Sequence, residues 1–329
     1  MLSSPWPTTL LRVSTPPSIP LLVILGPTAS GKSSLGLEVA ETLGGEIISA
    51  DAFAVYRGLD IGTDKPTLEE RARIPHHLID VAEPTERFSA GIFAAKADEA
   101  IDNIRARGNL PLVVGGTHFY IRALLLGLFP SPPHDPDVRA QLTEAWKRDP
   151  ASVVRRMQEV DPASAERIGP RDRQRVLRAL EVFELTGEPL SSHWNRHDAS
   201  SRYVSLLTAP RQPRADLYAR IDARVELMFA SGLVEEVEDI LASGVPPDAH
   251  ALKAIGYREV VGMLRGEIDR EEAIDLTKRS SRQLAKRQLT WLRNLSEGTL
   301  HWVPAANEGG ASEIVALWNR RFNLTGGGR

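Results

Sequence analysis

The chain of 329 residues is long enough for one large domain or two ordinary ones, and its 42% apolar residues can build a real core. It has no cysteine, which excludes disulfides, thiolate metal sites and a cysteine nucleophile and suits a cytoplasmic protein. The formal net charge of −3 excludes a general attraction to nucleic acid, so binding to a polyanion must depend on local basic patches.

The first twenty residues are rich in proline, serine and threonine, and Arg12 is their only charge. This composition predicts a disordered tail over residues 1–20, with an organellar transit peptide as the alternative because the stretch lacks acids. The glycines from Gly326 to Gly328 predict a second flexible end over residues 321–329. No run approaches about 20 apolar residues, so we expect no membrane-spanning helix.

After the tail, predicted strands and helices alternate. Short apolar runs predict buried strands at Leu21–Leu25, Glu46–Ser49, Leu112–Val114 and Val204–Thr208. Apolar residues at helical spacing predict helices at Ser33–Leu43, Phe93–Arg105, Leu217–Leu241 and Leu252–Leu264. Such alternation predicts an α/β fold: a P-loop NTPase-like parallel sheet with flanking helices, whose ligands bind at the carboxyl ends of the strands.

The alternation stops after Phe129. Prolines punctuate the loop that follows, and helical patterns then continue without a convincing strand up to about Ser200. We therefore predict a helical insertion domain over residues 130–200, set within a catalytic core of residues 21–129 and 201–320.

A phosphate-binding loop lies between the first predicted strand and the first predicted helix. The pattern G-x-x-x-x-G-K-[ST] is matched by Gly26, Pro27, Thr28, Ala29, Ser30, Gly31, Lys32 and Ser33. Backbone N–H groups and the helix N-terminus would bind phosphate oxygens, Lys32 would supply a positive charge, and the Ser33 hydroxyl would ligate Mg²⁺. Kinases, NTPases and some transferases all use this loop, so by itself it leaves the reaction open.

Five further segments accompany the loop in order along the chain: Ser49–Arg57, Asp60–Pro66, Gly115–Tyr120, Gly256–Glu259 and Ser281–Trp291. Together with the loop, they closely resemble the tRNA dimethylallyltransferases, also called isopentenyl-diphosphate:tRNA transferases. The likeness extends from about Leu21 to Trp302 and so covers most of the chain. The resemblance implies an enzyme that transfers a dimethylallyl group from dimethylallyl diphosphate to the exocyclic amine of the adenosine 3′-adjacent to the anticodon in tRNA, releasing diphosphate.

The resemblance also implies roles for individual residues. The phosphate loop would hold the diphosphate, with Mg²⁺ as cofactor, and Asp51 would be the base. A carboxylate suits that role, because the adenine amine is a poor nucleophile and has to lose a proton as it attacks. Thr117 and one arginine complete the catalytic candidates; the family pattern favours Arg224, and Arg220, one helical turn away, stays open.

An adenosine in a folded anticodon loop must leave its stack to reach such a site, which demands contacts to the RNA backbone. The resemblance assigns tRNA binding to Asp51, Ala52, Phe53, Ala54, Arg139, Gln174, Arg175, Arg178, Gly256, Tyr257 and Arg258. Basic residues gather in two runs that could supply such contacts. The first consists of Arg171, Arg173, Arg175 and Arg178, and the second of Lys278, Arg279, Arg282, Lys286, Arg287 and Arg293. Leucines between these cations indicate that one helix face is buried, so only some of them can face RNA; a solvated helix face is the alternative for both runs.

The chain departs from the family pattern beside Asp51, where Ala52 and Ala54 stand in place of the usual Ser and Gln. This leaves open how the adenine is oriented. Three other functions also stay open: a P-loop small-molecule kinase, a prenyltransferase of free adenine nucleotides, and a nucleotide-regulated RNA-binding protein without transferase activity. We expect a monomer.

Overall fold

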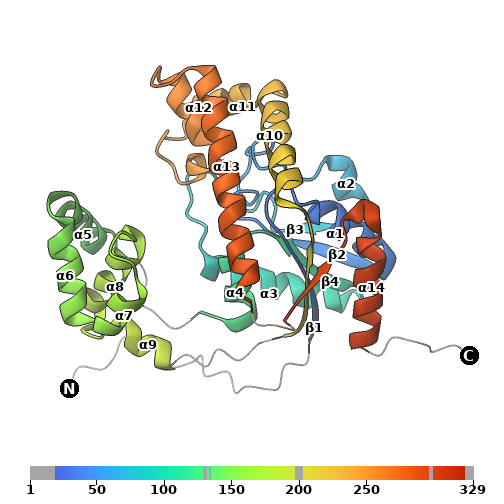
Figure 1. The fold of residues 1–329 in the computed structure, drawn as a ribbon, viewed down its shortest axis with the longest axis horizontal. Coiled ribbons are helices and arrows are strands. Elements are labelled where there is room, and N and C mark those ends of the chain that lie inside the picture. The colour runs from blue at the N-terminus through green and yellow to red at the C-terminus, as the bar shows by residue number, and fades with distance from the viewer. Residues whose placement is uncertain (1–18, 129–131, 133–134, 197–202, 296–298, 323–329) are drawn as a thin grey trace, which may run out of the picture. The chain divides into compact units, whose positions relative to one another are not determined.

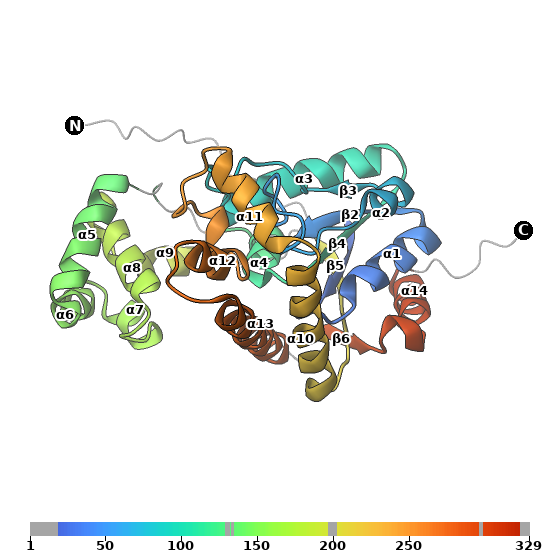
Figure 2. The same ribbon diagram turned by 90° about the horizontal axis from the view of Figure 1, so that it is seen from above.

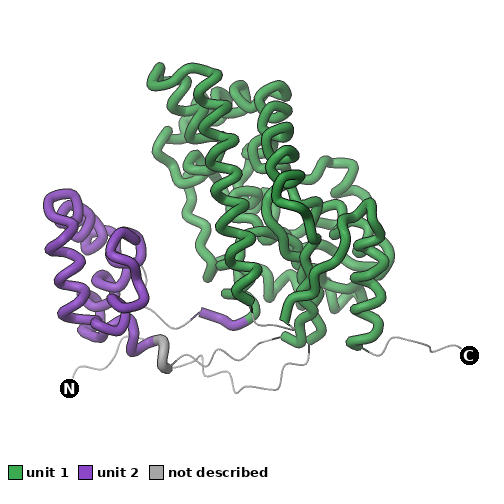
Figure 3. Tube along the Cα trace, viewed as in Figure 1, with its two compact units in different colours: residues 1–125, 201–329 green, residues 126–200 purple. Residues whose placement is uncertain are grey.

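A computed structural model describes residues 19–128, 132, 135–196, 203–295 and 299–322, excluding the side chains of residues 194–196. The chain divides into two compact units, one of residues 1–125 and 201–329 and one of residues 126–200 (Figure 3). The predicted tails fall outside the described residues except at their inner ends. There, Pro20 begins the first strand and Arg321 ends the last helix.

The first unit is built on a sheet of six parallel strands in the order β3-β2-β4-β1-β5-β6 (Figure 1). Their bounds are β1 Pro20–Leu25, β2 Gly45–Ala50, β3 His76–His77, β4 Leu110–Gly115, β5 Val204–Pro210 and β6 Leu300–Val303. The four predicted strands and the parallel sheet are confirmed. Sequence reasoning misses the edge strands β3 and β6, because runs of 2 and 4 residues carry too little apolar pattern.

The helices outside the second unit are α1 Lys32–Leu43, α2 Leu68–Arg73, α3 Ala90–Ala106, α4 His118–Leu126, α10 Arg214–Ala230, α11 Leu233–Ala242, α12 Tyr257–Leu264, α13 Arg270–Arg293 and α14 Gly310–Arg321. Helices cover both faces of the sheet, with α1 and α14 on one face and α3 on the other (Figure 2). Leu35 of α1 and Ile314 of α14 are completely buried in one hydrophobic cluster with Leu22 of β1. None of the described helices is long and apolar enough to cross a membrane.

The periodic stretch predicted as Leu217–Leu241 is broken into α10 and α11 at Gly232. This glycine has a left-handed backbone (φ 103°), which ends one helix and redirects the chain into the next. α13 follows α12 and runs beside α10 (Figures 1 and 2), where Ala285 packs against Leu217 and Ile221. The Asp269 side chain caps the first turn of α13 by accepting the N–H of Glu272.

The second unit is helical, as predicted, with α5 Pro136–Arg148, α6 Pro150–Val160, α7 Pro162–Arg167, α8 Arg173–Thr186 and α9 Leu190–Arg196. Three of these helices begin with the dipeptide Asp-Pro: Asp135, Asp149 and Asp161 each cap a helix whose first residue is proline. The unit has its own core, in which Met157 and Leu177 are almost completely buried. It therefore has the hydrophobic centre that an insertion domain needs to fold.

Candidate active site

Three loops of the predicted site meet at the carboxyl edge of the sheet, because β2, β4 and β1 are neighbours. Asp51 follows β2, the Gly116-Thr117 pair follows β4, and the phosphate loop follows β1. Their backbones approach so closely that a Cβ on Gly115 would lie 2.3 Å from Ala50 O, and one on Gly116 would lie 2.9 Å from Gly26 O. Only glycine fits at these two positions, so the Gly-Gly pair lets the strand ends pack together.

The phosphate loop bends through two residues with left-handed backbone, Ala29 (φ 61°) and Gly31 (φ 82°). This alternation turns successive N–H groups to one side, the geometry of an anion-binding nest. Gly31 also precedes α1, whose N-terminus adds partial positive charge. Lys32 and Ser33 begin the helix and line a pocket of about 460 Å³, which is a size suited to a small-molecule ligand.

The Lys32 ammonium holds its proton less tightly than an ordinary lysine does. Burial lowers its pKa to about 8; the Asp51 and Asp64 carboxylates oppose this shift, and Arg224 adds to it. Its Nζ donates to Pro27 O at 3.3 Å, a single weak hydrogen bond for a group with three donors. An arriving diphosphate can therefore bind Lys32 without displacing a strong partner.

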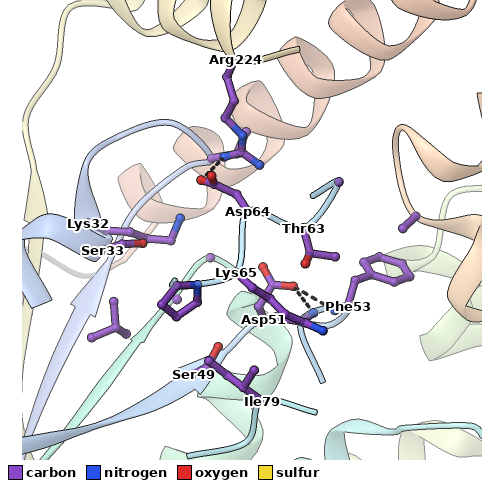
Figure 4. A pocket seen from close by; sticks show the side chains of 18 of the residues that line it. Lys32, Ser33, Ser49, Asp51, Phe53, Thr63, Asp64, Lys65, Ile79 and Arg224 are labelled. Carbon is purple, nitrogen blue, oxygen red and sulfur yellow. Dashed lines mark hydrogen bonds and ion pairs between the residues drawn. The ribbon is translucent and has the colours of Figure 1, made fainter. Parts of the chain in front are cut away.

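Two arginines of α10 reach the phosphate loop, as their spacing of four residues allows. Arg224 Nη1 donates to Thr28 Oγ1 at 3.0 Å and pairs with Asp64 Oδ2 at 3.2 Å (Figure 4). Arg220 lies beside Gly31, where a Cβ would come within 3.5 Å of its Nη2. Arg224 lines the pocket whereas Arg220 does not, so Arg224 remains the stronger candidate for binding diphosphate.

Asp51 is held by its own turn. Its Oδ1 accepts the N–H groups of Phe53 at 2.8 Å and Ala54 at 3.1 Å (Figure 4), which is an Asx-type turn. Within the described residues Oδ2 accepts no hydrogen bond, so one carboxylate oxygen fixes the side chain while the other can accept a proton. The Phe53 ring also lines the pocket and stacks on His250 with ring centroids 6.1 Å apart.

Thr117 is not among the residues that line the pocket. Its Oγ1 accepts the N–H of Ala52 at 3.1 Å, and its own N–H donates to Ala50 O at 3.2 Å. The hydroxyl thus joins the end of β4 to the residue that follows Asp51, and its proton remains able to rotate toward a ligand.

The Asp60–Pro66 segment, for which the sequence suggested no role, forms one wall of the pocket. The side chain of Lys65, within this segment, is buried, and its Nζ donates to Tyr56 O at 2.6 Å and pairs with Asp60 at 2.6 Å and Asp80 at 2.5 Å. Because the Lys65 ammonium is buried and all three of its donors are paired, it holds the Asp60–Pro66 segment in one conformation. Asp64 of the same segment also lines the pocket, and its side chain is 62% exposed.

Tyr257, predicted to bind tRNA, is completely buried. Its hydroxyl donates to Glu236 Oε1 at 2.5 Å and accepts the N–H of Gly62 at 3.1 Å, so the side chain supports the pocket wall. A side chain buried in this way is not accessible to RNA, so the tRNA contact predicted for Tyr257 stays a prediction for its backbone alone. In the Gly256–Arg258 segment, the backbone and the Arg258 side chain remain as groups that could contact RNA. The Arg258 guanidinium donates to Glu259 and Ser280.

Several predicted tRNA-binding residues of the second unit form one network around Glu181, a completely buried carboxylate. Arg178 pairs with it at 2.9 Å and also donates to Pro132 O, while Arg139 lies 3.6 Å from it and donates to Gln174. The Arg175 side chain is instead 73% exposed and pairs with the surface residue Asp172 at 3.5 Å. The structure thus separates cations that neutralise a buried acid from one that is open to a polyanion.

The second basic run lies on α13. Lys278 pairs with Glu226 and Arg282 with Asp222, both on α10, so two of the six cations are already neutralised. The buried face expected from the leucines is confirmed by Leu292, which is 1% exposed. The exposed cations of the run are Arg279, Lys286, Arg287 and Arg293.

If the loop binds dimethylallyl diphosphate, as the sequence predicts, we expect the affinity for this ligand to fall as pH rises through about 8. The anion prefers the protonated Lys32 and raises its pKa, so binding above pH 8 takes up a proton and Kd grows by up to about tenfold per pH unit. Titration calorimetry in two buffers of different ionisation enthalpy measures this proton. An uptake of zero at about pH 9 would show that Lys32 is not coupled to the ligand.

Asp64→Asn should tighten diphosphate binding. Arg224 is paired with Asp64, and a diphosphate that binds Arg224 would have to replace that carboxylate. Because the Asp64 side chain is well exposed, the gain should be small, about two- to fivefold in Kd. Asparagine also tolerates the left-handed backbone of this position (φ 56°). Competition with inorganic diphosphate measures the effect, and weaker binding would mean that Asp64 supports the ligand.

The phosphate loop follows a central parallel strand, and the Asp51 carboxylate follows a nearby strand. Arg224 of α10 lines the same pocket. These features define a protein of the phosphate-binding-loop class with a transferase-like site. The family model described as IPP transferase matches residues 54–295. The chain belongs to this family.

Similar proteins and solved structures support the same family. The chain is 50% identical over 285 residues to tRNA dimethylallyltransferase 1 of Trichlorobacter lovleyi, covering 86% of this chain and 93% of the relative. Its fold is similar to tRNA delta(2)-isopentenylpyrophosphate transferase of Staphylococcus epidermidis, with 38% identity, TM-score 0.68 and coverage of 92% and 100% of the two chains. It is also similar to a eukaryotic dimethylallyltransferase acting on tRNA, with 27% identity, TM-score 0.80 and coverage of 93% and 80%.

Proposed function

We propose that this protein transfers a dimethylallyl group from dimethylallyl diphosphate to the exocyclic amine of the adenosine 3′-adjacent to the anticodon in tRNA, releasing diphosphate. The observation that carries the proposal is that one pocket contains Lys32, Arg224 and Asp51 together. Groups for an anionic leaving group and for an attacking amine are thus present side by side. The names of the relatives and the structure of a relative acting on tRNA support the same reaction.

The chemistry follows from these groups. The loop N–H groups, Lys32 and Arg224 bind the diphosphate and stabilise the charge that it gains as the carbon–oxygen bond breaks. The adenine nitrogen forms a bond to the prenyl carbon, and Asp51 Oδ2 takes the proton that the amine loses. The products are the dimethylallylated adenosine, diphosphate and a proton, so atoms and charge balance.

Mg²⁺ fits this site as part of the proposal. Mg²⁺ prefers oxygen ligands and keeps several waters and substrate phosphate oxygens, so it needs few protein ligands. The Ser33 hydroxyl lines the pocket at the start of α1 and would hold the ion. When bound, the ion would neutralise charge on the diphosphate.

One experiment separates this function from its rivals. The protein is incubated with dimethylallyl diphosphate and either unmodified tRNA or AMP, and with ATP in parallel, and products are measured by mass spectrometry. We expect one dimethylallyl group added to tRNA. Transfer to AMP alone would indicate a prenyltransferase of free nucleotides, phosphoryl transfer from ATP a kinase, and tRNA binding without any transfer a binding protein.

RNA binding should depend on exposed cations. In the second unit Arg175→Glu tests this, because it reverses an exposed charge without disturbing a buried ion pair. Reversing Arg178 would place a carboxylate beside the buried Glu181 and destabilise the unit. We expect Arg175→Glu to weaken tRNA binding by roughly three- to tenfold and to reduce its salt dependence, as measured by gel shift at several salt concentrations. Arg155→Glu, at a similarly exposed site of the same unit, should leave affinity unchanged. Equal affinities for both variants would argue against this surface.

We also propose that the protein acts as a monomer in the cytoplasm. One chain supplies every lining residue of the described pocket, and a chain without cysteine is suited to a reducing compartment. Size-exclusion chromatography with light scattering measures the first property, and localisation of a tagged protein the second.

A further inference from the structure

Gln288 is a buried side-chain amide of α13 that bridges two loops of the site. Its Oε1 accepts the N–H of Thr28 at 2.9 Å, and its Nε2 donates to Gly116 O at 2.9 Å. Gln288 is 8% exposed and lines the pocket. An amide is suited to this position because it offers a donor and an acceptor without charge.

The bridge joins the two chemical halves of the site. On one side Thr28 belongs to the phosphate loop and also accepts a hydrogen bond from Arg224. On the other side, Gly116 is followed by Thr117, whose hydroxyl holds the backbone next to Asp51. Hydrogen bonds of Gln288, Arg224 and Thr117, together with the peptide links Gly116-Thr117 and Asp51-Ala52, therefore connect the groups for the diphosphate to the candidate base.

The helix that carries Gln288 is itself fixed against the same loops. One turn further along, Trp291 stacks on His118 with ring centroids 4.1 Å apart and an interplanar angle of 8°. One turn earlier, Ala285 packs against Leu217 and Ile221 of α10, the helix that carries Arg224. Packing on both sides leaves the amide little freedom, which is what a positioning group requires.

We infer that Gln288 is a positioning residue that sets the separation between the leaving diphosphate and Asp51. The inference rests on the proposed function and adds to it. Gln288 touches no reacting atom; it acts through Thr28 and Gly116. A displacement of about 1 Å between reacting groups costs on the order of a hundredfold in rate, so losing the bridge affects transfer more than binding.

The test compares Gln288→Glu with Gln288→Met in single-turnover transfer with both substrates saturating. A carboxylate still accepts the Thr28 N–H but faces Gly116 O without a proton to donate, whereas a protonated carboxyl restores the donor. We expect Gln288→Glu to be roughly 10- to 100-fold slower than the parent near pH 8, with KM for dimethylallyl diphosphate changed only a few-fold. The deficit should shrink as pH falls toward about 6, because burial beside a carbonyl raises a carboxyl pKa.

Gln288→Met should be slow at every pH, since its side chain can make neither bond. Gln283→Glu is the matched control, the same change at an exposed position of the same helix, and should follow the parent at all pH values when tRNA is saturating. A Gln288→Glu rate within twofold of the parent near pH 8, or a deficit that pH does not alter, would overturn the inference.

Two further results keep the test decisive. If Gln288→Glu does not fold, as judged by circular dichroism, amide hydrogen exchange of the parent decides: protection of the Thr28 N–H supports the bridge, and exchange as fast as in an open loop contradicts it. Failure of the proposed function itself is a different result, because then the parent protein transfers no dimethylallyl group to tRNA at any pH.

Discussion

Asp51→Asn should slow the transfer step by about 10²- to 10⁴-fold while both ligands stay bound. The amide oxygen of asparagine can still accept the N–H groups of Phe53 and Ala54, so the turn that holds the side chain is kept. What is lost is Oδ2, the carboxylate oxygen that accepts no hydrogen bond from the described residues and is available for the proton. Because Ala52 and Ala54 offer no side-chain hydrogen bonds, Asp51 should also orient the adenine, and we expect the loss to lie toward the larger value.

Single-turnover transfer with saturating dimethylallyl diphosphate and tRNA isolates this step from binding and release. Dissociation constants for both ligands are measured in parallel, and Asp51→Ala serves as the comparison, since it removes the hydrogen bonds of the turn as well as the proposed base. If Asp51→Asn kept a rate within a few-fold of the parent enzyme, the base would have to be sought elsewhere in the pocket.

Lys32→Ala should lower kcat/KM for dimethylallyl diphosphate by about 10²- to 10³-fold, the loss typical when a fixed group that stabilises developing charge is removed. Lys32 is the first residue of α1, so its charge adds to the partial charge of the helix N-terminus at the same place. Binding of tRNA should change little, because the exposed cations predicted to contact RNA lie on α8, α12 and α13 and not on α1.

Steady-state kinetics at saturating tRNA measures the first effect and gel shift the second. Ser33→Ala provides a graded comparison: it keeps the charge and removes the hydroxyl proposed to ligate Mg²⁺, so its deficit should be smaller and should depend on Mg²⁺ concentration. A variant of either residue that bound tRNA poorly but turned over bound substrate normally would place these residues outside the diphosphate site.

The sequence by itself determined the fold class, the phosphate loop and the strand ends that carry the site. These features depend on patterns within a few neighbouring residues. A run such as Leu21–Leu25 is apolar because both faces of its strand are buried, and the loop that follows needs its glycines at fixed positions. The parallel topology then follows from the alternation of such runs, and it puts Asp51 at the same edge as Lys32.

Only the tertiary structure decided which polar side chains meet. Gln288 binds Thr28 across 260 positions of the chain, and Arg178 neutralises a glutamate whose burial no local pattern reveals. The structure also buries the side chain of Tyr257, where its hydroxyl binds the pocket wall at Gly62. A hydrogen bond between distant segments leaves no periodic trace in the sequence, because it depends on how helices pack against the sheet, and packing is settled by the chain as a whole.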